Sequence, residues 1–184
     1  MLDAAIEALC ADGYARVTTT EIARRAGVSR GAQLHHFPTK ADLLTAAVEH
    51  LLERRMREFV DSLTTMAAGA DRIDASMDLV WSMFQGPTFV AWMELWLAAR
   101  TDADLAATMI ATDERFTTES RKLFVEVVTD IGAYDPETLE MLRDLAFAVM
   151  TGVALQRLIP RDRRPASDYL DILKRLGHSM VGAE

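Results

Sequence analysis

The sequence predicts an all-α protein, and three observations support that fold class. Glycine and proline are sparse, with nine and five copies in 184 residues. The long segments between them repeat apolar residues at helical spacing and show almost no strand-like alternation. Hydrophobic residues make up 50% of the chain, so it can bury one sizeable core, or one core and a small appended module.

The first predicted helix ends at Gly13. The apolar residues on one of its faces are Leu2, Ile6, Leu9 and Cys10. A second helix is predicted over residues 19–26. Thr18 and Glu21 have the spacing of a capping box, in which each side chain accepts a hydrogen bond from the backbone N–H of the other residue. Gly27 is suited to a left-handed C-terminal cap.

Two further capping signals predict the next helices. Ser29 can cap a short third helix over residues 30–35. Thr39 and Asp42 repeat the capping-box spacing and open a long fourth helix, which reaches about residue 63.

A lapse in periodicity follows, and then two more helices. Residues 66–71 lose the helical repeat, and we interpret them as a loose joint. An apolar stripe over residues 73–84 predicts the next helix. Residues 88–99 are apolar nearly all round, which is typical of a helix buried on most sides.

Three helices complete the predicted fold. Thr101 and Asp104 are expected to cap a long one, which reaches about residue 131 unless it breaks near Thr112. An Asp-Pro pair opens the next helix, over residues 135–160. After a basic loop, Ser167 is expected to cap the last helix.

Composition limits the class of protein. No apolar run reaches the roughly 18 residues that span a bilayer. The first ten residues carry acids where a signal peptide carries a basic start, so we expect a cytoplasmic protein. Cys10 is the only cysteine, which excludes an internal disulfide, and we expect it to pack as a small apolar residue.

The net charge of −8 is unevenly distributed. Residues 1–57 hold eight Lys and Arg against seven Asp and Glu, and residues 16–40 hold five bases and one acid, Glu21. Charge acts over a Debye length, so a local basic patch can attract phosphate on an acidic protein.

The helices over 19–26 and 30–35, with a short Gly-containing turn between them, match the helix-turn-helix geometry. Thr19 and Thr20 lie in a first helical turn, where free N–H groups favour a phosphate oxygen. Arg30 begins the next helix and can donate two hydrogen bonds to a base. This spacing alone is a weak signal, which the local charge and the caps strengthen.

Three runs resemble the DNA-binding domain of the tetracycline-repressor (TetR) family. They are TTTEIARRAGVSRGA from Thr18, HHFPTK from His35 and ADLL from Ala41. The resemblance covers Met1 to about Leu52, and the remainder resembles the family only in helix layout and length. It implies a helix-turn-helix DNA-binding domain over residues 1–52 and a helical effector-binding and dimerisation domain over 53–184.

By position, the resemblance implies a set of residues near DNA. Thr19, Leu34, His36 and Lys40 would contact the backbone, and Thr20, Arg30, Gly31 and Ala32 would face the groove. The full set of expected DNA-binding residues is Thr19, Thr20, Ser29, Arg30, Gly31, Ala32, Gln33, Leu34, His35, His36 and Lys40.

The chain departs from the family pattern at Gln33 and Leu34, where members typically have Leu-Tyr. Leu34 has no hydroxyl, so a phosphate bond is lost. Gln33 either turns outward as an adenine reader or forms a hydrogen bond inside the domain. The chain begins inside its first helix, and we expect any basic N-terminal arm to be absent or removed.

No residue pattern predicts catalysis, a cofactor or a metal site. His35 and His36 are adjacent and His50 and His178 are isolated, so the histidines do not form a recognisable ligand set. The sequence also lacks a recognisable nucleophile motif and a Gly-rich phosphate loop. We therefore expect a protein that is not an enzyme.

Ten Met and three Trp suggest an adaptable apolar cavity, although such residues more often form ordinary core. Because few ionisable residues accompany them, Glu94 being the main one, we expect a hydrophobic or aromatic effector. The residues expected to line the cavity are Trp81, Phe84, Phe89, Trp92, Met93, Trp96, Met109, Phe116 and Met150.

The last two helices carry apolar stripes broad enough to pair with their copies about a two-fold axis, although one of these faces must also close the monomer core. The residues expected in a homodimer interface are Leu139, Leu142, Leu145, Val149, Val153, Leu170, Leu173 and Leu176.

We interpret the chain as a transcriptional regulator, a repressor released from a palindromic operator by a small hydrophobic ligand. A single helix-turn-helix reads too few base pairs to find one genomic site, which favours a dimer. The alternatives are a helical carrier of apolar small molecules without a DNA function and, with less support, a helical-bundle enzyme.

Overall fold

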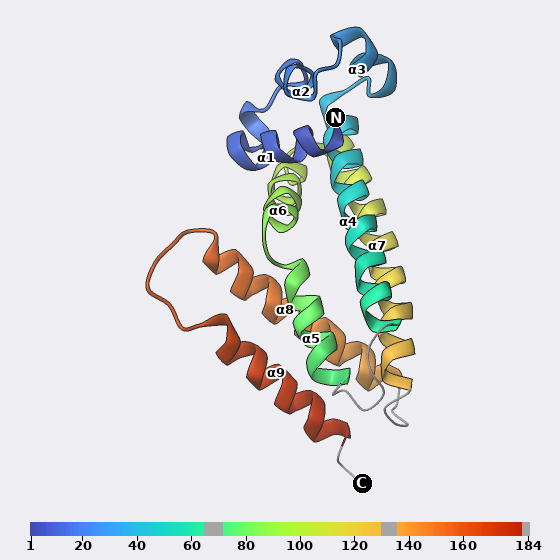
Figure 1. Cartoon of the computed structure of the whole chain (residues 1–184), viewed down its shortest axis with the longest axis vertical. Coiled ribbons are helices and arrows are strands. Elements are labelled where there is room, and N and C mark those ends of the chain that lie inside the picture. The colour runs from blue at the N-terminus through green and yellow to red at the C-terminus, as the bar shows by residue number, and fades with distance from the viewer. Residues whose placement is uncertain (65–71, 130–135, 182–184) are drawn as a thin grey trace. The chain divides into compact units, whose positions relative to one another are not determined.

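The computed structural model describes residues 1–64, 72–129 and 136–181 (Figure 1). All regular structure in these ranges is helical, which confirms the predicted fold class. The predicted loose joint at 66–71 lies outside the described residues. The helices are α1 (Leu2–Arg16), α2 (Thr19–Ala26), α3 (Arg30–His36), α4 (Lys40–Thr64), α5 (Arg72–Met83), α6 (Pro87–Ala99), α7 (Ala103–Thr129), α8 (Pro136–Arg157) and α9 (Ala166–Val181).

The chain divides into two compact units. Unit 1 comprises Met1–Arg55 and Gly86–Thr117, and unit 2 comprises Met56–Gln85 and Thr118–Glu184. The helices α4 and α7 each contribute to both units. The functional division predicted at residue 52 stays a prediction, since compactness alone does not define where a DNA-binding function ends.

The core of unit 1 joins α1, α2, α4, α6 and the first part of α7. Helix α1 packs against both α2 and α6. The buried apolar residues of this core include Ile6, Leu9, Ile22, Leu43, Leu44, Val48, Leu95, Leu105 and Met109.

Helix α1 is interrupted at Gly13 but does not end there, which corrects the predicted boundary. Gly13 has φ 72° and ψ 162°, and helix resumes for one turn to Arg16. The interruption frees the N–H of Tyr14, which donates to Glu94 Oε2 on α6 at 2.9 Å. A side chain at residue 13 would be strained at this φ, and its Cβ would lie 3.1 Å from that carboxylate oxygen.

Three of the predicted caps form in unit 1. Ser29 Oγ accepts from Ala32 N–H at 3.1 Å. Thr39 and Asp42 form a complete capping box, with both reciprocal bonds made. Thr18 Oγ1 accepts from Glu21 N–H at 3.3 Å, but among the described residues the reciprocal bond is not made, because the Glu21 carboxylate binds arginines instead.

Helix α7 begins differently from the prediction and continues where a break was considered. Asp102 caps it, accepting from Leu105 N–H at 3.0 Å, whereas Thr101 donates back to Ala98. Thr112 is buried and donates to Glu49 Oε1 of α4 at 2.7 Å. This contact satisfies the hydroxyl within a continuous helix.

The core of unit 2 joins α5, α8 and α9. Helix α9 packs against both α5 and α8. Lys174 Nζ of α9 lies 2.7 Å from Asp78 of α5, and His178 lies 2.9 Å from Asp74. The first residue of α9 is Ala166, so Ser167 lies inside the helix, and its predicted role as cap is wrong.

Helix α6 is less buried than predicted. Phe89, Met93 and Leu95 are buried, but Trp96 and Leu97 are 40% and 60% exposed. Within the part of the chain that the structure describes, no helix combines the length and apolar character needed to cross a membrane.

Candidate nucleic-acid interface

A tight turn links α2 to α3 and fixes the angle between them. Gly27 has φ 67° and ψ 24°, the predicted left-handed cap. Its N–H donates to Arg24 O at 3.2 Å, and Val28 N–H donates to Ala23 O at 3.0 Å. These two bonds form a Schellman motif, and Ser29 then caps α3. The backbone of the turn is thus hydrogen-bonded on both sides, which favours a single orientation for α3.

Helix α3 presents most of the predicted DNA-binding residues to solvent. Arg30 lies at its first position and has no ion-pair partner among the described residues. Thr20 on α2 is exposed and Thr19 is half-buried. The exposed residues of α3 are Arg30, Gly31, Ala32, Leu34, His35 and His36.

Gln33 points into unit 1, which decides between its two predicted orientations. It is 0% exposed, and its Nε2 donates to Phe37 O at 2.8 Å, at the C-terminal end of α3. Gln33 therefore leaves the set of candidate base readers. Its Oε1 is buried without a hydrogen-bond partner, so the amide nitrogen of Gln33 is hydrogen-bonded and the amide oxygen is not.

We expect Gln33→Leu to change the free energy of unfolding by less than about 1 kcal/mol, because a lost hydrogen bond is offset by removal of an unpaired buried oxygen. The variant should keep the same preferred operator bases. Chemical denaturation and selection of bound DNA sequences check the two parts. A changed preference at one base position would show that Gln33 reads DNA after all.

Lys40 is predicted to contact a DNA phosphate, and in this structure it contacts α1. Its Nζ donates to Tyr14 O and lies 4.2 Å from the centroid of the Tyr14 ring. A cation in a first helical turn opposes the helix dipole, and the carbonyl and ring face compensate for it. Burial lowers the pKa of Lys40. Contact of Lys40 with DNA stays a prediction.

The other bases of the basic patch are largely held by acids of unit 1. The Glu21 carboxylate accepts from Arg24 and Arg25, each at 2.7 Å, and Arg25 also contacts Asp12 at 3.0 Å. Hydrogen bonds from Arg24 and Arg25 lower the pKa of Glu21 from its ordinary 4.5 to about 2. Arg30 has no such acid, which favours it as the base that reads DNA.

This arrangement predicts a stability contribution that depends on pH. Because the pKa of Glu21 is lower in the folded protein, its ion pairs stabilise the fold above pH 4.5 and lose that effect as pH falls toward 2. Carboxyl-carbon NMR should give a Glu21 pKa near 2, and Arg24→Gln should raise it. A pKa at the ordinary value in the wild-type protein would contradict the ion-pair geometry.

The predicted cavity residues form two groups, one in each unit. In unit 1, Trp92 and Trp96 stack with ring centroids 5.8 Å apart, while Phe89, Met93 and Met109 are buried. Phe116, also in unit 1, is half-buried. A single cavity that joins these residues to those of unit 2 stays a prediction.

In unit 2, Trp81 stacks on Phe84 at 6.4 Å, Phe84 meets Phe147 edge-on at 5.5 Å, and Met150 is buried. Glu94, the predicted ionisable candidate for the cavity, instead closes the interruption in α1.

Arg143 of α8 is a buried cation that the sequence analysis missed. Its side chain is 5% exposed, its Nε donates to Asp144 at 3.0 Å, and its Nη1 is buried without a partner. Arg143 and Met150 share a helix face, because seven residues complete nearly two turns. That spacing is a usable signal in the sequence, although arginine is rarely buried and the residue type alone does not indicate it.

The residues predicted in the dimer interface differ in how much of each side chain is exposed. Leu170 and Leu173 are buried in the monomer, whereas Leu145 and Leu176 are exposed. Leu142, Val149 and Val153 are half-buried, and the side chain of Leu139 lies outside the described residues. The exposed apolar stripes, which we call the α8/α9 face, consist of Met141, Leu145, Ala148 and Leu155 on α8 and Ile172 and Leu176 on α9.

Comparison with known proteins identifies relatives of this chain. Residues 1–47 match the family described as "Bacterial regulatory proteins, tetR family". HTH-type transcriptional regulator CymR of Pseudomonas putida is 32% identical over 165 residues, covering 89% of this chain and 80% of CymR. The uncharacterized HTH-type transcriptional regulator Rv2912c of Mycobacterium tuberculosis is 33% identical over 109 residues, covering 59% of this chain. The match spans about half, 56%, of that relative's length.

Solved structures share the fold. One from Pseudomonas aeruginosa PAO1 has a TM-score of 0.74 at 22% identity, covering 99% of this chain and 88% of that one. The transcriptional regulator FadR of Bacillus subtilis, in complex with stearoyl-CoA, has a TM-score of 0.65 at 16% identity, covering 98% and 93%. The helical architecture, the capped helix-turn-helix and the extent of identity with CymR lead to one conclusion: the chain belongs to the tetR family of bacterial regulatory proteins.

Proposed function

We propose that the protein is a sequence-specific DNA-binding transcriptional regulator that inserts α3 into the major groove. The observation that carries this proposal is the pairing of the hydrogen-bonded turn after α2 with an exposed Arg30 at the start of α3. The relatives' names as HTH-type transcriptional regulators support the same function. Such a protein acts where bacterial DNA is, in the cytoplasm, and its role requires no catalysis.

Arg30 is the proposed base reader, since a guanidinium can donate two hydrogen bonds to guanine O6 and N7. Gly31 and Ala32 are small and exposed, so the backbone of α3 can approach the base edges closely. Thr19 and Thr20 lie at the N-terminus of α2, where a phosphate oxygen can accept from free N–H groups. Leu34, His36 and Lys40 would contact the sugar-phosphate backbone.

The regulator is proposed to act as a homodimer through the α8/α9 face. This face exposes large apolar side chains, and Ala148 and Gly152 lie in the same stripe of α8. A Cβ added at Gly152 would meet nothing within 4 Å, so a second helix has room to approach. Two copies would present two α3 helices to half-sites about one helical turn apart or slightly more.

A small hydrophobic or aromatic effector is proposed to release the protein from DNA. FadR of Bacillus subtilis was solved in complex with stearoyl-CoA, which supports a fold that can bind an apolar ligand. Helix α4 contributes to both units along the chain, and we expect it to move as a lever when the Trp and Met residues enclose a ligand. To shift the population from mostly bound to mostly released, the ligand must favour the DNA-free state by about 3 to 5 kcal/mol.

The DNA function is tested by fluorescence anisotropy with a mixed-sequence duplex across a range of salt concentrations. A DNA-binding regulator should bind, and log K should fall linearly with log salt. Arg175→Gln, at an exposed position of α9, is the control variant: it removes one positive charge outside the proposed DNA interface and should leave duplex binding unchanged. Absence of duplex binding at low salt, together with quenching of tryptophan fluorescence by apolar compounds, would instead favour a carrier of small molecules.

The effector response is tested by following tryptophan fluorescence and operator binding together during titration with apolar compounds. Trp96→Ala should weaken the response and leave operator binding nearly intact, because Trp96 is 40% exposed on α6 and belongs to neither α2 nor α3. If compounds that quench the tryptophans never alter DNA affinity, the lever is wrong and the aromatic residues are ordinary core.

A further inference from the structure

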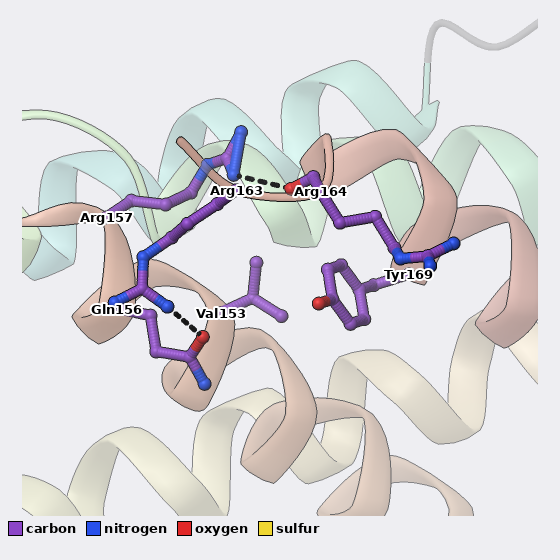
Figure 2. A pocket seen from close by; sticks show the side chains of 6 residues that line it. All are labelled: Val153, Gln156, Arg157, Arg163, Arg164 and Tyr169. Carbon is purple, nitrogen blue, oxygen red and sulfur yellow. Dashed lines mark hydrogen bonds between the residues drawn. The ribbon is translucent and has the colours of Figure 1, made fainter. Parts of the chain in front are cut away.

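A pocket of about 230 Å³ lies in unit 2, where the chain passes from α8 to α9 (Figure 2). Helix α8 contributes its last turns, the connection contributes two arginines, and α9 contributes a tyrosine. The lining residues are Val153, Gln156, Arg157, Arg163, Arg164 and Tyr169. None of them belongs to the proposed DNA interface or to the predicted aromatic cavity.

The pocket concentrates positive charge. Three of its lining residues are arginines and none is an acid. Asp168 Oδ2 lies 3.9 Å from Arg164 Nη1, and both side chains are exposed. Three guanidiniums beside this one carboxylate leave a net positive charge at the pocket.

Hydrogen bonds hold two of the arginines at the pocket wall. Arg163 Nη1 donates to Gln156 Oε1 at 2.7 Å, and Arg157 Nη1 donates to Arg164 O at 3.2 Å, as Figure 2 shows. These bonds orient the guanidiniums before any ligand arrives, which lowers the entropic cost of binding.

One donor of a pocket-lining arginine is unsatisfied. Arg163 Nε is buried and has no hydrogen-bond partner. Buried polar groups in folded proteins nearly always have a partner, so the Arg163 guanidinium keeps a hydrogen-bonding capacity that none of the described residues uses. Carboxylate and phosphate oxygens match the planar fork of arginine.

We propose that this pocket binds a small organic oxyanion. Its carboxylate or phosphate oxygens accept from Arg163 and the neighbouring arginines, and its apolar body packs against Val153 and Tyr169. A volume of about 230 Å³ equals roughly seven to eight waters of liquid, which suits a compact ligand smaller than those of most drug-binding pockets. The site depends on unit 2 alone and does not require the proposed DNA function.

The site lies at the edge of the face proposed for dimerisation, because the pocket residue Gln156 follows Leu155 directly and lies one helical turn after Gly152 of the same stripe. Occupation of the pocket would neutralise like charges beside that face. We therefore expect the bound oxyanion to strengthen self-association, which is a second and separate readout.

The test is calorimetric titration of the full chain with benzoate, phenyl phosphate, inorganic phosphate and the neutral benzamide. We expect the two aromatic oxyanions to bind, inorganic phosphate to bind at least tenfold more weakly, and benzamide not to bind. Arg163→Gln should weaken the aromatic oxyanions at least tenfold. Arg175→Gln, which removes an exposed arginine of α9 outside the pocket, should leave their binding unchanged.

Thermal unfolding verifies that both variants are folded, and Arg157→Gln provides a second test of the pocket should Arg163→Gln not fold. Equal weakening by Arg163→Gln and Arg175→Gln would overturn the proposal, since it would indicate general surface charge. Absence of oxyanion binding at millimolar concentration, or equal affinity for benzamide and benzoate, would also overturn it. None of these readouts uses DNA, so failure of the site and failure of the proposed function are distinguishable.

Discussion

Replacement of Arg30 by Ala is expected to weaken operator binding by roughly 1 to 3 kcal/mol, about 5- to 150-fold, and to relax base preference at one position of each half-site. Arg30 is exposed at the first position of α3 and no acid among the described residues pairs with it. Its donors are therefore available to a base without breaking an ion pair. Anisotropy titrations against operator duplexes that differ at single positions measure both effects.

Lys40→Ala is the contrasting variant. If Lys40 contacts a phosphate, its loss should weaken all sequences alike and lower the salt slope by about one. The contact with Tyr14 makes a stability control necessary, since removal of the ammonium also frees a carbonyl and a ring face of α1. Equal losses from the Arg30 and Lys40 variants, independent of sequence, would contradict the assignment of Arg30 as reader.

Leu145→Glu is expected to convert the proposed homodimer to a folded monomer. Leu145 is 49% exposed in the monomer, so a carboxylate there meets water when the protein is alone and apolar side chains when it is paired. Burial of that unpaired charge in the interface costs several kcal/mol. Sedimentation velocity at micromolar concentration measures the change.

Two controls separate dimerisation from folding. Leu173→Glu, at a residue that is 6% exposed, should destabilise the monomer itself by several kcal/mol. Ile110→Glu places the same charge on an exposed apolar site of α7 and should leave self-association unchanged. A Leu145→Glu protein that stays dimeric, or a wild-type monomer that binds single half-sites tightly, would refute the proposed interface.

The local features of the fold could be predicted because their chemistry is local. The cap at Ser29, the left-handed Gly27 and the capping box at Thr39 each depend on residues within a few positions of one another, and all three form. The cap of α7 differs from the predicted pair, Thr101 and Asp104. Asp102 and Leu105 have the same three-residue spacing and lie one position further along the chain. Local rules offer both alternatives, and only the packed structure selects one.

The features that could not be predicted depend on tertiary contacts. The neighbours of Gln33 in the sequence do not distinguish an outward side chain that faces DNA from an inward one. In the structure its side chain is buried and donates a hydrogen bond to Phe37 O. Glu94 and Lys40 both turn toward Tyr14, a contact between residues far apart in the chain. The proposed anion pocket depends on how the connection after α8 folds back, which no spacing rule contains.

In the proposed mode of binding, the two α3 helices of one dimer read a palindromic operator. Selection of sequences bound by the wild-type protein from a random duplex library tests it most directly. The account predicts enrichment of an inverted repeat whose half-site centres lie about one helical turn apart or slightly more, with one base position lost in the Arg30→Ala protein. No enrichment over the starting library, or enrichment of an isolated half-site by the wild-type protein, would contradict it.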